Sequence, residues 1–231
     1  MINMFSYTGY YSSWFIFVLP AILFATYAQM KISSSYKKYS KIPSKSGLTG
    51  AQVARYILDK NGLNEVRIEQ VRGVLTDHYD PRARVLRLSP EVYSGSSIAS
   101  VSVASHEVGH AIQHQDGYFP LILRNTIAPI AMFGSNLVWI FIILGFIFSP
   151  FFINLGIALF IAAVLFQIVT LPVEFNASRR ALQQLENGII SRDQIDQAES
   201  MLKAAALTYV AATLVAISEL LRLLAITNRR R

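Results

Sequence analysis

The sequence contains no cysteine among its 231 residues. Disulfide bonds and thiolate metal ligands are therefore excluded, and a metal site would have to use histidine, aspartate or glutamate. Charged residues are also scarce, at 15% of the chain, whereas hydrophobic residues make up 53%. This balance is unusual for a soluble protein and favours a single domain combined with membrane spans.

Histidine is nearly as scarce, with only four in the chain. Three of them, His106, His110 and His114, fall within one short stretch, and the fourth is His78. Scattered structural roles would not require such a cluster. The stretch around the three histidines is therefore the first candidate for a functional site.

Residues 98–114 read IASVSVASHEVGHAIQH, contain no proline and follow two serines that can cap a helix. On the predicted helix, His106 and His110 share a face, so their imidazoles suit a zinc ion. Glu107 would reach a water at the metal, take its proton and deliver it to a leaving amine. Gly109 would let another backbone or a substrate approach closely. The HExxH spacing alone is weakly specific, because a helix with a polar, solvated face also produces it.

Three uncharged runs predict membrane spans: residues 14–30, 129–148 and 151–171. Only Ser149 and Pro150 separate the last two runs, which predicts a transmembrane hairpin. Five lysines follow the first run, at positions 31, 37, 38, 41 and 45. Basic clusters beside apolar runs indicate a cytosolic segment rather than a nucleic-acid site, so we expect no nucleic-acid partner.

The hairpin predicts which side of the membrane the following residues occupy. Two crossings return the chain to the side it left, so the residues after Leu171 lie on the side of His110. Glu174 comes just after this re-entry and can therefore reach the metal. Arg179 and Arg180 fit a cytosolic location by their charge.

Residues 204–226 leave two alternatives open. Positions 204–218 are apolar and rich in alanine, but Glu219 and Arg222 follow. A fourth crossing would place the arginines at 229–231 outside, against the positive-inside rule. A packed cytosolic helix would keep them inside.

The soluble part carries signals for helices and strands. Residues 49–62 predict an amphipathic helix that begins with a capping box formed by Thr49 and Gln52. Residues 64–71, 74–81 and 84–89 predict strands, the last two joined by a turn at Asp80-Pro81. The strand at 84–89 could be an edge that holds an extended peptide by strand addition.

These elements predict an α+β membrane protein that is mostly helical. Transmembrane helices accompany a small zincin-like domain with a short β-sheet and the HExxH helix. The predicted parts are an N-terminal transmembrane helix (1–30), a cytosolic half with the HExxH helix (31–124), a transmembrane hairpin (125–172) and a helical segment with the third zinc ligand and a possible fourth membrane helix (173–231).

Three motifs carry a resemblance to a known family: HEVGHAIQH at 106–114, LTDHYDP at 75–81 and LPVEFNASRRA at 171–181. Together they resemble the YugP-type membrane zinc metallopeptidases over most of the chain. More distantly, the chain is similar to the HtpX-like membrane proteases of the gluzincin group. The resemblance implies that His106, His110 and Glu174 bind one zinc ion (Zn2+) per chain and that Glu107 is the base.

The sequence departs from the gluzincin pattern at one position. Gluzincins often carry an aspartate four residues after the ligand glutamate, where it orients a ligand histidine. Here that position is Ser178. The orienting group would then be Ser178 itself, Asn176, or a distant carboxylate such as Asp77 or Asp80.

Three further residues have both a functional and a structural interpretation. His114 lies eight residues after His106 and could bind the metal, although a role in the cleft or in packing is favoured. His78 could donate to an oxyanion or merely cap a turn. Arg179 could stabilise an oxyanion, pair with a lipid phosphate or anchor the helix on the cytosolic side.

The leading hypothesis is a membrane-anchored zinc endopeptidase, multi-pass in the cell membrane, with its active site on the cytosolic side near the membrane surface. It would act on membrane proteins or membrane-proximal peptides. An intramembrane protease is disfavoured, because residues 96–114 are rich in serine and the later spans contain no aspartate. The non-enzymatic alternative is a membrane scaffold with a structural metal site.

Overall fold

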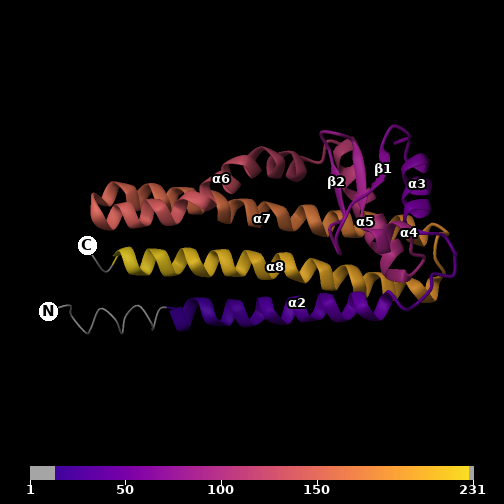
Figure 1. Ribbon diagram of the computed structural model, residues 1–231, viewed down its shortest axis with the longest axis horizontal. Helices are drawn as coiled ribbons and strands as arrows, with labels where there is room; N and C mark the ends of the chain where they lie inside the picture. Colours follow the sequence, from indigo (N-terminus) through magenta and orange to yellow (C-terminus); the bar gives the residue numbers. More distant parts are fainter. Residues whose placement is uncertain (1–13, 229–231) are drawn as a thin grey trace. The chain divides into compact units, whose positions relative to one another are not determined.

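The computed structural model describes residues 14–228 (Figure 1). Within this range the chain forms two compact units. The apolar unit comprises residues 14–29, 123–171 and 208–228, and the mixed unit comprises residues 30–122 and 172–207. The long helices run from one unit into the other, so each unit is assembled from segments far apart in the sequence.

The described residues include four helices long and apolar enough to cross a membrane. They are η1 (Trp14–Val18) with α2 (Leu19–Tyr39), α6 (Phe119–Ile147), α7 (Pro150–Glu186) and α8 (Arg192–Asn228). The first three confirm the predicted apolar helices, and α8 contains the segment that the sequence left open. The hairpin turn is confirmed, since α6 ends at Ile147 and α7 begins at Pro150.

Close helix packing characterises the apolar unit. A Cβ atom on Gly145 of α6 would lie 2.7 Å from the backbone nitrogen of Ile153 in α7, so only glycine fits beside the turn. Val138 and Ile142 of α6 form a buried cluster with Leu223 of α8. These contacts join three of the apolar helices.

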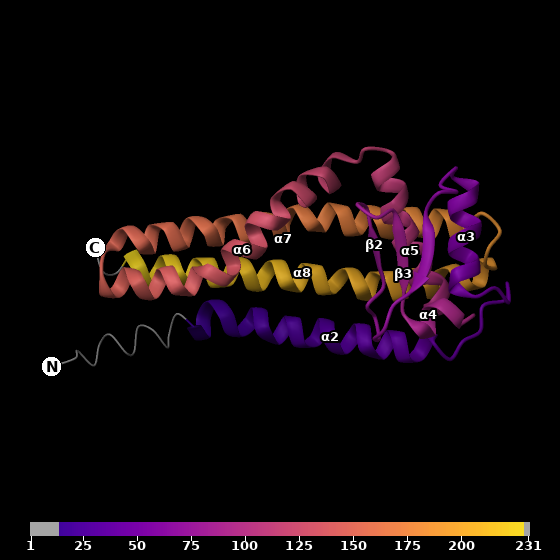
Figure 2. The ribbon, with the colours of Figure 1, turned by 45° about the horizontal axis from the view of Figure 1, so that its top comes forward.

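The helices of the mixed unit begin at side-chain caps. At the start of α3 (Gly50–Lys60), Thr49 and Gln52 form the predicted capping box. At the start of α5 (Ile98–Gln115), the Ser97 hydroxyl accepts from the backbone N–H of Ser100 at 3.1 Å. The short helix α4 (Pro90–Ser94) precedes α5 (Figure 2). The predicted HExxH helix is therefore present as one continuous helix.

A three-stranded sheet in the order β1-β3-β2 belongs to the mixed unit. Its strands are β1 (Arg67–Gln70), β2 (His78–Asp80) and β3 (Val85–Leu88), with β1 and β3 parallel and β2 and β3 antiparallel. The turn between β2 and β3 is as predicted. The prediction that residues 84–89 form an edge strand is wrong, because β3 pairs on both sides. Val85, Leu86 and Leu88 are fully buried, which places this strand at the centre.

One apolar core unites the mixed unit. Residues of α3, β3 and α5 contribute most of it, together with the C-terminal part of α7 and the N-terminal part of α8. Examples are Ile57, Leu86, Val108, Leu185 and Met201, all less than 2% exposed. Because α5 is buried in this core, its side chains are held in fixed positions.

Candidate metal centre

Three metal-binding side chains meet where α5 contacts α7. One donor atom from each of His106, His110 and Glu174 lies within 4.8 Å of the other two. The Nε2 atoms of His106 and His110 lie 3.2 and 3.6 Å from the Glu174 Oε2 atom. The predicted shared face of the two histidines is confirmed by their ring centroids, which are 4.9 Å apart.

A glycine allows the two helices to approach. A Cβ atom on Gly109 would lie 2.6 Å from the backbone oxygen of Ala177 in α7, closer than side chains allow. The predicted close approach to this glycine is confirmed, and the approaching backbone is that of α7. Gly109 precedes His110, and Ala177 lies one helical turn after Glu174, so this contact holds the cluster together.

The cluster is shielded from solvent. Glu174 is 2% exposed and His110 is 9% exposed. Burial lowers the pKa of His110, but the hydrogen bond and charge of Glu174 outweigh it and leave that pKa above its ordinary value. The buried carboxylate therefore has an electrostatic partner in the imidazole beside it.

The donor set fits zinc. Two imidazole nitrogens and one carboxylate oxygen are a common ligand set of catalytic zinc sites, which keep a fourth position for water or substrate. Zinc–ligand bonds of about 2.0–2.1 Å in a tetrahedron place ligand atoms roughly 3.3 Å apart. The nitrogen–oxygen distances of 3.2 and 3.6 Å lie close to this separation.

Ser178 contacts the second ring nitrogen of His106. Its hydroxyl oxygen lies 3.2 Å from His106 Nδ1. Ser178 is four residues after Glu174 on α7, so both side chains point to the same face of the helix. The structure thus brings together Ser178 and His106, as expected if this serine takes the place of the gluzincin aspartate.

Gln113 is a contact of the cluster that the sequence prediction missed. Its Oε1 atom lies 3.0 Å from His110 Nδ1, and its Nε2 atom donates to Asn176 Oδ1 at 2.9 Å. Asn176 therefore contacts Gln113 instead of a ligand histidine. Gln113 follows His110 by three residues, and this helical spacing is the sequence signal that could have identified it.

Glu107 lies beside the cluster without belonging to it. The residue is 9% exposed. Within residues 14–228, its carboxylate makes no hydrogen bond or ion pair. A carboxylate that is not bonded to another protein group is available to exchange a proton with a water molecule.

The other two histidines lie outside the cluster. His114 Nδ1 is 2.9 Å from the Tyr79 hydroxyl, a contact that connects α5 to β2. His78 is exposed on β2, where its Nδ1 atom is 2.8 Å from the Thr76 carbonyl oxygen. The structure thus places His114 against Tyr79 and outside the metal cluster.

The predicted carboxylates Asp77 and Asp80 and the predicted Arg179 also lie outside the metal cluster. Asp77 accepts from the backbone N–H of Ser89 at 2.7 Å, and burial raises the pKa of Asp77 while these bonds partly offset the rise. Asp80 pairs with Arg87 at 3.1 Å. Arg179 is exposed and lies five residues after Glu174, which places it on a different face of α7. Among the described contacts, none of these groups is bonded to His106 or His110.

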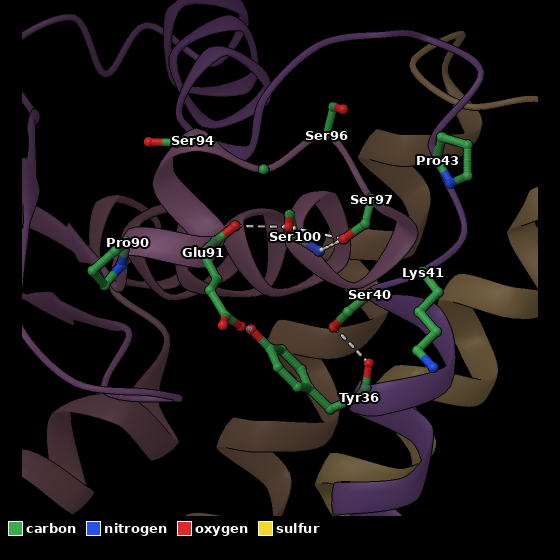
Figure 3. A pocket seen from close by; sticks show the side chains of 11 residues that line it. Tyr36, Ser40, Lys41, Pro43, Pro90, Glu91, Ser94, Ser96, Ser97 and Ser100 are labelled. Carbon is green, nitrogen blue, oxygen red and sulfur yellow. Dashed lines mark hydrogen bonds between the residues drawn. The ribbon is translucent and has the colours of Figure 1, made fainter.

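A separate pocket of about 580 Å³ lies between the end of α2, α4 and the start of α5 (Figure 3). Its Glu91 carboxylate accepts from the Tyr36 hydroxyl at 3.0 Å, and its Ser100 hydroxyl donates to the Glu91 carbonyl oxygen at 3.0 Å. No member of the metal cluster lines it. The pocket is therefore distinct from the candidate metal centre.

Comparison with known proteins agrees with the chemistry of the cluster. A family described as "Putative neutral zinc metallopeptidase" matches residues 14–228. The chain is similar to a Bacillus subtilis (strain 168) protein named "Putative membrane protease YugP", with 53% identity over 211 residues, which cover 90% of this chain and 94% of that protein. No solved structure matches the chain. The family expected from the three motifs is thus confirmed.

Proposed function

The chain belongs to this family of neutral zinc metallopeptidases, and from that premise we propose that it is a membrane-anchored, zinc-dependent endopeptidase. The observation that carries the proposal is the buried cluster of His106, His110 and Glu174 with Glu107 beside it. Family membership alone would not identify these groups.

The residues of the cluster have distinct roles in the proposed reaction. His106, His110 and Glu174 would hold the metal. A bound zinc ion would polarise the scissile carbonyl and acidify a water molecule. The Glu107 carboxylate accepts the proton of the attacking water and then delivers it to the amide nitrogen that leaves. Because Glu107 makes no hydrogen bond or ion pair in the described chain, both transfers can use the same carboxylate.

Membrane proteins or their cytosolic flanks are the proposed substrates. Glu174 follows the apolar run that ends at Leu171 by only three residues, and α5 ends at Gln115, shortly before α6 begins at Phe119. Both helices that bear the cluster are therefore tethered close to apolar segments. The five lysines after the first run support a cytosolic location for the cluster.

Two observations disfavour the alternative functions. The candidate membrane helices of the described chain do not include α5, so the histidine pair lies outside the segments that an intramembrane protease would use. A purely structural metal site would not need a carboxylate beside it, such as that of Glu107, that makes no hydrogen bond or ion pair in the described chain.

The decisive experiment measures metal content and proteolysis on the same purified, full-length protein. We expect about one zinc ion per chain, and cleavage of a test protein that stops after chelation and returns with zinc. Bound zinc without proteolysis under any condition that keeps the protein folded would favour the scaffold alternative.

A further inference from the structure

We propose that Gln113 is a positioning residue that fixes the orientation and tautomer of His110, so that the Nε2 lone pair of His110 faces the metal position. The inference rests on the proposed function for the identity of the metal. The orientation of His110 itself is argued from the hydrogen bonds between the side chains. It assigns a role to a residue outside the ligand set and outside the acid–base chemistry.

The surroundings of Gln113 determine which way its amide group points. The side chain is completely buried. Its Nε2 atom donates to the Val173 carbonyl oxygen at 2.8 Å, and a carbonyl oxygen can only accept. An amide flipped by half a turn would place two oxygens against each other there. The Oε1 atom of Gln113 must therefore face His110.

Asn176 fixes the same orientation from a second direction. Its Oδ1 atom accepts from Gln113 Nε2 at 2.9 Å and from Arg180 Nε at 2.8 Å. Since a guanidinium group only donates, the oxygen of Asn176 must point toward Arg180. Arg180 is held in turn by an ion pair with Asp116 at the end of α5. The donor direction is thus set along the whole series from Arg180 to Gln113.

The orientation of the Gln113 amide determines which nitrogen of His110 carries the hydrogen. Its Nδ1 atom lies 3.0 Å from Gln113 Oε1, which can only accept, so Nδ1 must carry a hydrogen. In the neutral ring the lone pair then resides on Nε2, the atom 3.6 Å from Glu174 Oε2. A neutral imidazole with its Nε2 lone pair free is the form that binds zinc.

The Val173 contact also links ring orientation to helix position. Val173 precedes Glu174, so Gln113 of α5 is hydrogen-bonded to the backbone of α7 directly beside the third candidate ligand. One side chain therefore sets the His110 ring and the local position of α7 together. Gln113→Met keeps the length of the side chain but removes both hydrogen-bonding atoms. This substitution should therefore free the His110 ring to rotate and loosen the contact with α7.

The test combines zinc affinity with a spectroscopic readout that needs no metal. Zinc dissociation constants are measured by chelator competition on the full-length protein in detergent, for wild type and Gln113→Met. Loss of such an orienting partner typically weakens metal binding by about 10–100-fold, and we expect a loss in this range. The matched control is Gln184→Met on α7. Among residues 14–228, the buried Gln184 Oε1 atom has no hydrogen-bond partner, so this substitution should not affect zinc.

The tautomer is read from ¹⁵N-histidine spectra of metal-free protein at alkaline pH, where the rings are neutral. The chain has four histidines, so each signal can be assigned by single substitution. We expect His110 to carry its hydrogen on Nδ1 in wild type and on Nε2 in Gln113→Met. A wild-type ring protonated on Nε2, or unchanged zinc affinity in a folded Gln113→Met protein, would overturn the proposal. If wild type shows the Nδ1–H tautomer but binds no zinc, the role of Gln113 in ring orientation stands and the zinc-dependent function fails.

Discussion

Glu107 is the residue on which the proposed proton transfers depend. Its carboxylate is buried, lies next to a candidate ligand, and makes no hydrogen bond or ion pair within the described chain. Glu107→Gln keeps the shape and removes the base. We expect zinc content and thermal stability close to wild type, and peptide cleavage lower by at least about a hundredfold. Normal cleavage by this variant would end the mechanism, and loss of zinc would move Glu107 into the ligand set.

Substitutions of Glu174 and His114 are expected to have opposite effects on metal binding. Glu174 Oε2 lies within 3.6 Å of both candidate histidine nitrogens, whereas His114 contacts Tyr79. We therefore expect Glu174→Ala to lose zinc about as severely as His106→Ala, while His114→Ala retains it. Metal analysis of the purified variants measures this difference. Retention of zinc by Glu174→Ala together with its loss in His114→Ala would show that the ligand set is wrong.

At the residue scale, roles that depend on spacing within one helix could be predicted from the sequence. Contacts between residues far apart in the chain could not. The spacing of His106 and His110 predicted a shared face from helix geometry alone. The spacing of Gln113 from His110 could have indicated their contact. The other partners of Gln113, Val173 and Asn176, are 60 and 63 residues away in the chain. No periodicity within α5 could show that these carbonyl groups would meet its amide.

At the scale of elements, the contact between α5 and α7 is the feature most open to a direct test. Gly109→Ala would place a methyl group about 2.6 Å from the Ala177 oxygen, so the helices would have to separate. Overpacking of this kind typically costs about 1–3 kcal/mol. We expect a lower unfolding temperature and weaker zinc binding, because Glu174 would move away from the histidines.

A second small substitution on α5 provides the control for Gly109→Ala. Ser102 is completely buried and its hydroxyl has no hydrogen-bond partner in the described chain. Ser102→Ala should leave zinc affinity unchanged. Unaltered zinc affinity in Gly109→Ala as well would mean that the close approach does not position Glu174.

Helix starts and the β2–β3 turn followed from local chemistry, whereas strand lengths and strand order did not. The strands predicted at 64–71 and 74–81 are limited to Arg67–Gln70 and His78–Asp80. The caps at Thr49 and Ser97 and the turn at Asp80 use side chains that bond within three residues, and each was predictable. The central place of β3 depends on parallel pairing with β1, which the sequence between them does not encode locally. The apolar residues Val85, Leu86 and Leu88 are the sequence feature that fits a central strand, and the structure buries all three.

At the scale of the whole molecule, the number of proposed membrane crossings depends on α8, one of the four helices long and apolar enough to span. Its apolar part contacts helices that the sequence already marked as spans. Thr213 Oγ1 lies 3.3 Å from the Gln167 oxygen of α7, and Leu223 packs with Val138 and Ile142 near the middle of the apolar run of α6. These contacts favour the fourth crossing over the cytosolic alternative.

The two charged residues within the apolar part of α8, Glu219 and Arg222, do not contradict a crossing. Arg222 Nε is 2.7 Å from Glu219 Oε2, and the Arg222 side chain is 6% exposed. Its guanidinium also lies over the Trp139 ring, at 5.8 Å from the ring centroid. Charged residues within membrane helices usually face the helix bundle and pair with each other, as this pair does.

Reporter fusions along the chain can establish the topology. With residues 31–45 cytosolic, one crossing by α6 and a return by α7 place a reporter at Lys45 in the cytosol and one at Ser149 outside. A fourth crossing places a reporter fused after Asn228 outside, against the charge rule for the arginines that follow. We expect this pattern because α8 packs against both helices of the hairpin, α6 and α7. A cytosolic C-terminal reporter would show that α8 does not cross, and equal locations for Lys45 and Ser149 would refute the hairpin itself.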